Sequence, residues 1–193
     1  MTSAPWLVVI DMQVIFADPE SDWATPGFAA IVPAVRSLVE AYAPRVVFTR
    51  FVAPETPTGA WVPYYQQWPF ALVPPTDRLY DIVGELARPD LPVVSRPTFG
   101  KWDAELAGLL GQEPEMVLAG VSTDCCVLST ALAAADAGVR VRVVADACAG
   151  VSEQDHQRAL DAMSLYGPLI EITHAADLGA PAHEPQPRTD GRG

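Results

Sequence analysis

The stretch Met116-Val-Leu-Ala-Gly-Val-Ser-Thr-Asp-Cys-Cys-Val127 decides the fold that this sequence predicts. Residues 116–119 form a short apolar run typical of a buried strand, and the run ends at Gly120. Three residues that often cap helix N-termini follow, and an alanine-rich helical stretch extends over residues 124–137. The sequence therefore predicts a strand that leads into a helix, with two adjacent cysteines in the first helical turn.

The predicted position of Cys125 and Cys126 has a chemical consequence. Amide N–H groups in the first turn have no partner within the helix, and the helix dipole favours negative charge there. We therefore expect a thiol in this turn to lose its proton more easily, and the thiolate is the nucleophilic form. The same N–H groups suit an oxyanion that develops on a substrate carbonyl. From spacing alone, each cysteine is either an activated nucleophile or a small buried residue.

The rest of the chain repeats the order of strand and then helix. Further strands are predicted at residues 6–10, 45–49, 91–95, 139–145 and 169–173. Helices are predicted at residues 31–43, 79–86, 102–110 and 152–165, the last with Ser152 as its N-cap. Residues 51–75 show no clear period. This alternation predicts an α/β fold of three α-β-α layers with a six-stranded, mostly parallel, Rossmann-like sheet and a site at the carboxyl ends of its strands.

Composition limits the classes of function. The 193 residues fit one domain, predicted at residues 1–179, with a disordered tail at residues 180–193. A net charge of -12 with no basic stripe argues against nucleic acid as a partner, and no apolar run is long enough to cross a membrane. Three cysteines make no disulfide framework and the chain starts without a secretory signal, so we expect a cytoplasmic protein.

Two charged residues stand where a cysteine nucleophile would need them. Asp11 follows the apolar strand at residues 6–10, and Lys101 lies in a loop after the strand at residues 91–95. An aspartate can accept the thiol proton, and a lysine can stabilise the thiolate. Each residue also has an interpretation without catalysis: Asp11 could be the N-cap of the next segment, and Lys101 could be a solvated lysine in a loop. We expect Lys101→Ala to leave folding nearly unchanged, because the ammonium contributes charge and not packing. The three histidines have no metal-ligand spacing with one another or with a cysteine.

Four motifs together carry a resemblance to a known family. They are the D-x-Q-x-x-F segment at residues 11–16, Phe99-Gly-Lys101, the G-V-x-T-D-x-C-V turn at residues 120–127, and Asp146-Ala-Cys-Ala149. In this order and spacing they resemble the isochorismatase-like cysteine hydrolases, relatives of nicotinamidases and N-carbamoylsarcosine amidohydrolases. The resemblance covers about residues 5–175 and implies that family's three-layer hydrolase fold.

The resemblance implies roles for particular residues. The family's catalytic aspartate, lysine and cysteine fall on Asp11, Lys101 and Cys126, which leaves Cys125 as a small packed residue. Its oxyanion hole falls on the backbone N–H groups of Ser122 and Cys126. The peptide bond between Val121 and Ser122 is expected to be cis.

The resemblance also implies a reaction. We expect a hydrolase that cleaves a C–N bond of a small amide, carbamoyl or ureido compound through a thioester, without a cofactor. Nicotinamidases follow the second strand with a metal-binding Asp-x-His pair, which is missing from residues 48–55, so we expect metal-independent catalysis. Two alternatives remain: an isochorismatase-type vinyl ether hydrolase that would not need Cys126, and a binding module of the same fold.

The irregular stretch at residues 51–75 is the predicted wall of the substrate pocket. It is dense in aromatic residues, and we assign Trp61, Tyr64 and Trp68 to the pocket. Phe16 and Trp23, nearer the N-terminus, are expected to join the same wall. Arg50 could anchor a substrate carboxylate or pair with an acid at the strand end. The aromatic residues could instead pack a long loop or form a subunit interface. We expect a homodimer or homotetramer.

Overall fold

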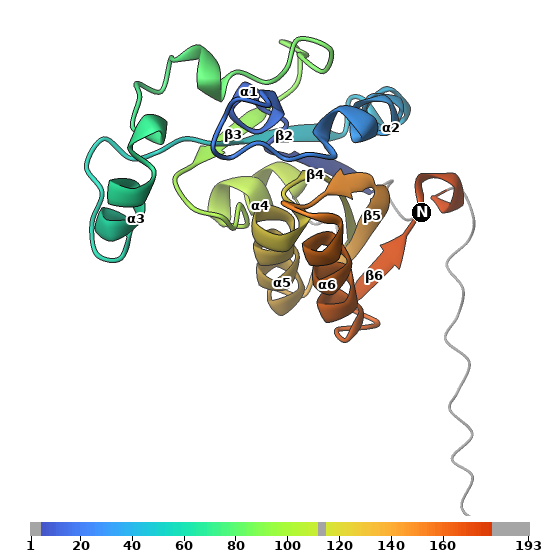
Figure 1. The fold of residues 1–193 in the computed structure, drawn as a ribbon. Helices are drawn as coiled ribbons and strands as arrows, with labels where there is room; N and C mark the ends of the chain where they lie inside the picture. The colour runs from blue at the N-terminus through green and yellow to red at the C-terminus, as the bar shows by residue number, and fades with distance from the viewer. Residues whose placement is uncertain (1–4, 112–114, 179–193) are drawn as a thin grey trace, which may run out of the picture.

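A six-stranded parallel sheet forms the centre of the protein in a computed structural model that describes residues 5–111 and 115–178 (Figure 1). Its strands are β1 (Trp6–Ile10), β2 (Val46–Phe51), β3 (Val93–Arg96), β4 (Glu115–Val121), β5 (Arg140–Ala149) and β6 (Ile170–Thr173). They lie in the order β3-β2-β1-β4-β5-β6, and every neighbouring pair is parallel. The predicted fold class and number of strands are confirmed.

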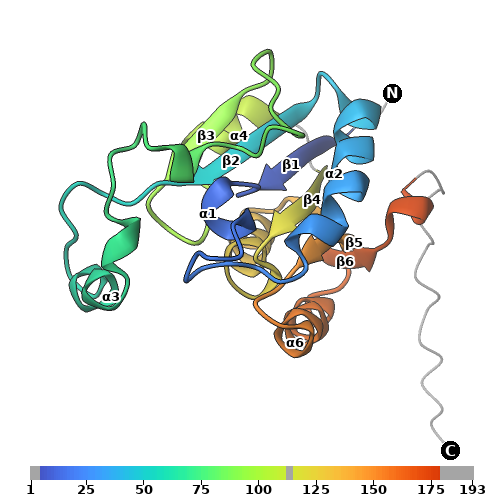
Figure 2. The same ribbon diagram turned by 45° about the horizontal axis from the view of Figure 1, so that its top comes forward.

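Helices cover both faces of this sheet. One face carries α1 (Val14–Ala17) and α2 (Phe28–Tyr42), whereas α4 (Ala104–Leu110), α5 (Leu128–Asp136) and α6 (Glu153–Ser164) pack on the other. Figure 2 shows α2 in front of the sheet and α3 (Trp61–Gln67) set apart from it. The arrangement is the three-layer fold that the alternation of strands and helices predicts.

The central strand β1 shows why the sheet is buried on both faces. Successive side chains of a strand point to opposite faces, so Leu7 and Val9 join the core beneath α2, and Val8 and Ile10 join the core on the other face. At Gly120 of β4 the two strands approach so closely that a Cβ atom would lie 2.1 Å from the Ile10 carbonyl oxygen. The φ of Gly120 is +118°, so only glycine fits this position without strain.

One predicted helix is wrong. Residues 79–86 have helical apolar spacing, but the structure has only a 3-10 helix at Arg78–Tyr80 followed by turns. The backbone of this segment instead pairs with the chain after β1: Val14 N donates to Asp81 O, and Val83 N donates to Met12 O. Because these tertiary hydrogen bonds compete with a helix, the local apolar period did not decide the conformation.

Residues 51–75 contain more regular structure than the sequence indicates. They include α3 and a 3-10 helix at Pro69–Ala71, and the short helix α1 was also not predicted. At α6 the prediction is confirmed, because the Ser152 side chain accepts a hydrogen bond from Asp155 N and caps the helix.

Two predictions concern the chain as a whole. The tail predicted at residues 180–193 lies outside the described residues. Within the described ranges, no helix combines the length and apolar character needed to cross a bilayer.

Candidate active site

Three segments bring Asp11, Lys101 and Cys126 together at the carboxyl edge of the sheet. Asp11 follows β1, Lys101 lies in the loop between β3 and α4, and Cys126 lies in the turn between β4 and α5. All three residues are buried, and Lys101 Nζ lies 2.9 Å from Asp11 Oδ2. The Asp11 carboxylate and Lys101 both lie near enough to shift the pKa of the Cys126 thiol, in opposite directions. Residues far apart in the sequence therefore form one cluster.

The Asp11 carboxylate is held from one side and open on the other. Thr49 Oγ1, at the end of β2, donates a 2.6 Å hydrogen bond to Asp11 Oδ1. Oδ2 faces Lys101, yet it accepts no well-aligned hydrogen bond from any group in the described part of the chain. The backbone of Asp11 has φ +48°, an uncommon conformation for a residue other than glycine. A strained aspartate with a free lone pair suits a residue that accepts a proton.

Lys101 is fixed by backbone contacts as well as by charge. Its Nζ donates to Thr98 O at 2.6 Å and lies 4.9 Å from the centre of the Phe51 ring. Its backbone N–H donates to Thr130 Oγ1 at 3.0 Å, and the same hydroxyl donates to Cys126 O at 2.6 Å. Thr130 of α5 therefore links the lysine loop to the cysteine turn.

The sequence predicts that the two cysteines lie in the first turn of an α-helix. They lie instead in a π-helical turn at Thr123–Val127 that precedes α5. Ser122 O accepts hydrogen bonds from the N–H groups of Cys125 and Val127, at 3.2 and 3.1 Å. The peptide bond between Val121 and Ser122 is cis, as expected. The structure thus changes the helix type but keeps both cysteines at the end of β4.

The turn is also tied to the start of α6. Thr123 Oγ1 and His156 Nδ1 lie 2.8 Å apart, and Asp124 Oδ1 accepts a 2.9 Å hydrogen bond from Val151 N. Gly150 permits this contact, because a Cβ atom there would lie 2.7 Å from Asp124 Oδ1. The polar residues next to the cysteines therefore position the turn rather than cap a helix.

The pKa of Cys126 moves in the direction opposite to the sequence-based expectation. Burial raises the pKa of this thiol well above its usual range, the Asp11 carboxylate raises it further, and Lys101 lowers it. Burial and the Asp124 carboxylate also raise the pKa of Cys125, to about 11. Desolvation therefore favours the neutral thiol of Cys126, which lies near the Asp11 carboxylate.

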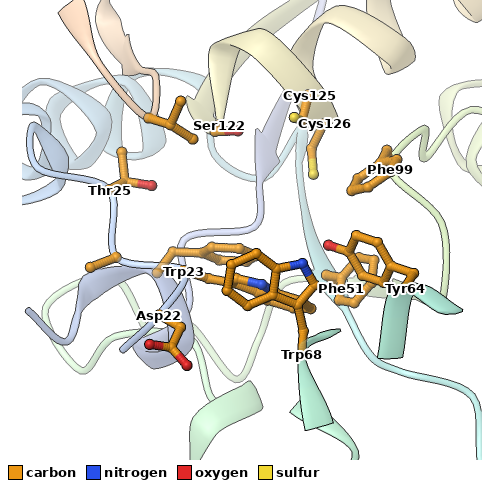
Figure 3. Close-up of a pocket in the computed structure, with 13 residues that line it drawn as sticks. Asp22, Trp23, Thr25, Phe51, Tyr64, Trp68, Phe99, Ser122, Cys125 and Cys126 are labelled. Carbon is orange, nitrogen blue, oxygen red and sulfur yellow. The ribbon is translucent and has the colours of Figure 1, made fainter. Parts of the chain in front are cut away.

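A cavity of about 410 Å³ opens beside the two cysteines. Six of its thirteen lining residues are aromatic, and Figure 3 shows the cysteines on one side with most of the rings below them. The lining residues are Phe16, Asp22, Trp23, Ala24, Thr25, Phe51, Tyr64, Trp68, Phe99, Ser122, Cys125, Cys126 and Val151. The cavity gives a small molecule access to the buried thiol.

Four of the six residues predicted for the pocket line this cavity, and two do not. Phe16, Trp23, Tyr64 and Trp68 are in its wall. Trp61 lies behind the wall, with its ring centroid 5.1 Å from that of Tyr64 and 5.3 Å from that of Phe99. Arg50 does not line it, because its Nε donates instead to Ser95 Oγ at 3.1 Å on the neighbouring strand. The suggested carboxylate anchor is therefore absent from the wall.

The inward direction of these rings also weakens the suggestion that they form a subunit interface. Tyr65 and Phe51 are almost completely buried within the protein, and Tyr64 and Trp68 face the cavity. The homodimer or homotetramer stays a prediction, which sedimentation at micromolar concentration would test.

Sequence reasoning missed several residues of the site. Thr49 and Phe51 end β2, directly beside the strand that carries Asp11, and that placement could have identified them. Asp22 and Thr25 come from the loop after α1. Nothing in their local sequence indicates that this loop folds over the cysteine turn.

The residues that the structure describes offer no cluster suited to hold a metal ion. The described chain contains no group of three or more His, Cys, Asp and Glu placed to hold one. Of the histidines it includes, His156 bonds Thr123 and His174 lies 3.8 Å from Asp146. The segment after β2 offers only the exposed Glu55, and His183 lies outside the described residues. No step of a reaction can be assigned to a metal from these donors.

Known structures share this fold. A cysteine hydrolase from Pseudomonas syringae pv. phaseolicola superposes with a TM-score of 0.80 and 21% identity, covering 90% of each chain. A pyrazinamidase from Pyrococcus horikoshii, solved in complex with zinc, gives a TM-score of 0.73 and 25% identity over 89% of this chain and 99% of that one.

Sequence comparison identifies the family. "Isochorismatase domain-containing protein 2" of Xenopus laevis is 36% identical over 99 residues, which are 50% of this chain and 48% of that protein. The aligned stretch thus spans about half the length of this curated relative. The isochorismatase domain family matches residues 5–176, nearly the whole described chain. With its parallel sheet and the cavity at the sheet's carboxyl edge, the chain therefore belongs to the isochorismatase family of hydrolases.

Proposed function

We propose that this protein is a cysteine-dependent hydrolase that cleaves a C–N bond of a small amide, carbamoyl or ureido compound. One observation carries the proposal: the thiol of Cys126 lines the cavity while the Asp11–Lys101 ion pair lies directly behind it. A nucleophile, a base and a positive charge within one cluster are the parts that covalent acyl transfer requires.

The proposed reaction begins with the neutral thiol. Cys126 Sγ attacks the carbonyl carbon as its proton passes to the open Oδ2 of Asp11. The backbone N–H groups of Ser122 and Cys126 bind the resulting oxyanion. The C–N bond then breaks, and Asp11 returns the proton to the departing ammonia or amine. Water, deprotonated by Asp11, hydrolyses the thioester and regenerates the thiol.

The raised pKa of Cys126 fits this order of events. A preformed thiolate would be costly in a buried site that already contains a carboxylate. Proton transfer during attack avoids that cost, because the negative charge moves from Asp11 toward the oxyanion. Lys101 stays next to the charge throughout, and its own position is fixed by Thr98 O.

The direct test is ammonia release from a panel of small amides, with two cysteine variants. Cys126→Ala should lower turnover by at least about 10³-fold, because it removes the nucleophile. Cys125→Ala is the matched control and should keep most activity. Circular dichroism should show both variants folded. The reverse result would mean that the wrong cysteine has been chosen.

The same experiment addresses the vinyl ether alternative. An isochorismatase-type reaction would use Asp11 as an acid and would not need a thiol. Turnover of a vinyl ether substrate by Cys126→Ala would therefore favour that alternative. A binding module would release ammonia from no amide at all.

We also propose that catalysis is independent of a metal, although the pyrazinamidase relative was solved with zinc. The support is the donor set, since the segment after β2 lacks the Asp-x-His pair. Extensive treatment with EDTA should leave the rate unchanged. Loss of activity that zinc or iron restores would contradict the proposal.

A further inference from the structure

The cavity beside Cys126 combines an aromatic wall with a single charge. Six of its lining residues are aromatic: Phe16, Trp23, Phe51, Tyr64, Trp68 and Phe99. Asp22 contributes the one carboxylate, and none of the described residues that line the cavity is a lysine, arginine or histidine. A ligand in this cavity therefore meets π faces and a negative charge.

The two nearest candidate cations cannot change this balance. Lys101 is completely buried, and its ammonium is already engaged by Asp11 and by Thr98 O. Arg50 lies outside the wall and donates to Ser95. Among the described residues, a substrate carboxylate would find no lysine, arginine or histidine in the cavity wall, and the net charge of -12 adds to the repulsion.

The aromatic rings are arranged around Trp23. Its ring centroid lies 5.9 Å from that of Tyr64, 6.1 Å from that of Phe16 and 6.4 Å from that of Trp68. Burial raises the pKa of Tyr64 to about 12, so its phenol is neutral near pH 7. Figure 3 shows Asp22 on the side of these rings away from the cysteines. Ring faces of this kind attract a cation, as in the aromatic cages that bind quaternary ammonium groups.

We propose that the cavity selects amides that carry a positive charge on an apolar body, and that Asp22 is the residue that determines this specificity. The inference rests on the proposed amide hydrolysis at the same site. The amide carbon would lie at Cys126 Sγ, and the cationic group would lie among Trp23, Trp68 and Asp22. The charge on the part of the substrate that does not react thus determines which amides the cavity prefers.

Three para-substituted benzamides test this charge selection at nearly constant shape. One carries a trimethylammonium group, one the isosteric neutral tert-butyl group, and one a carboxylate. The trimethylammonium compound should bind Cys126→Ala protein about fivefold or more tightly than the tert-butyl compound, since cation–π contacts favour it and binding does not depend on the reactivity of the amide. The carboxylate should bind most weakly. A tert-butyl compound that binds as tightly as the trimethylammonium compound, or more tightly, would overturn the proposal.

Asp22→Asn tests the assigned residue, because it removes the charge and keeps the shape. The preference for trimethylammonium over tert-butyl should fall about threefold, as expected for an exposed carboxylate near the ligand. Glu20→Gln is the matched control, since Glu20 is an exposed acid of the same loop that does not line the cavity. If Asp22→Asn and Glu20→Gln change the preference equally, Asp22 is not the determinant.

Binding separates this inference from the proposed function. The three benzamides can be titrated into Cys126→Ala protein, with tryptophan fluorescence as the readout, whether or not the wild type hydrolyses them. Tighter binding of the trimethylammonium compound without any hydrolysis by the wild type would support the selectivity and contradict the amidase. Hydrolysis of all three with equal binding would support the amidase and overturn the selectivity.

Discussion

The catalytic cluster and the aromatic wall lie side by side but are held in different ways. Asp11, Lys101 and Cys126 are buried, and their neighbours Thr49 and Thr130 fix them from β2 and α5. The wall comes largely from the loop after α1 and from the segment around α3, and its rings are held by contacts with one another. The candidate catalytic cluster is thus tied to the sheet, whereas much of the wall lies in loops that can vary without moving Cys126.

The two regions also differ in charge. The cluster contains an ion pair without solvent access, but the wall carries one exposed acid, Asp22. Substitutions in the cluster should therefore change turnover or stability strongly, because a lost partner leaves a buried charge. Substitutions in the wall should change substrate preference and little else.

The largest effect is expected from Asp11→Asn, which should lower turnover about 10²- to 10⁴-fold by removing the base. The Asp11 carboxylate raises the pKa of Cys126, so the same substitution lowers that pKa. Alkylation of Cys126 by iodoacetamide at pH 8 should therefore become faster while hydrolysis becomes slower. If both rates fell together, Asp11 would hold the structure of the site rather than accept the proton.

Lys101→Met should destabilise the protein by about 3–5 kcal/mol, because it leaves the Asp11 carboxylate buried and unpaired. This replaces the sequence-based expectation that folding would hardly change, which assumed that the lysine ammonium contributes charge and not packing, because Lys101 is completely buried and paired with Asp11. Lys101 lowers the pKa of Cys126, so alkylation should also become slower at neutral pH. Urea unfolding measures the first effect and mass spectrometry the second.

Arg88→Met is the matched control for the loss of an ion pair, since the pair of Arg88 with Asp90 is exposed. Its unfolding midpoint should stay close to that of the wild type, because solvent screens such pairs. Equal effects of Lys101→Met and Arg88→Met would remove the distinction between a buried cluster and an exposed surface.

Alkaline pH should lower the stability of the fold through the buried thiol of Cys148. Burial raises the pKa of Cys148 from 9.0 to about 12, so the unfolded chain releases this proton first. The corresponding stability is complete below about pH 9 and is lost as pH rises toward 12, at about 1.4 kcal/mol per pH unit. Between pH 9 and 10, the stability of Cys148→Ala should fall less steeply than that of the wild type.

The smallest effects are expected in the wall and directly behind it, where Trp68 and Trp61 differ in role. Trp68→Leu removes a ring that lines the cavity and should raise KM about three- to tenfold with little change in kcat. Trp61→Leu removes packing behind Phe99 and Tyr64 and should cost about 1–2 kcal/mol of stability. Steady-state kinetics and thermal unfolding of both variants would show whether their roles differ.

Local sequence was sufficient to predict the strands and the residues that directly follow them. The apolar runs predicted all six strands to within a few residues, and the residues after them included Asp11 and the two cysteines. It was insufficient where distant backbone groups pair, as they do between residues 12–14 and 81–83. The same limit applies to Arg50, whose guanidinium bonds Ser95 of the adjacent strand rather than facing the cavity.

The sequence by itself determined the α/β fold, because the 2- and 3.6-residue apolar periods are local properties of strands and helices. Its motifs also determined the family and the three candidate catalytic residues. Only the tertiary structure decided their electrostatic state. Burial and the Asp11 carboxylate raise the pKa of Cys126, and Lys101 is completely buried in the core. Such effects depend on which groups lie nearby in space, and no local pattern contains that information.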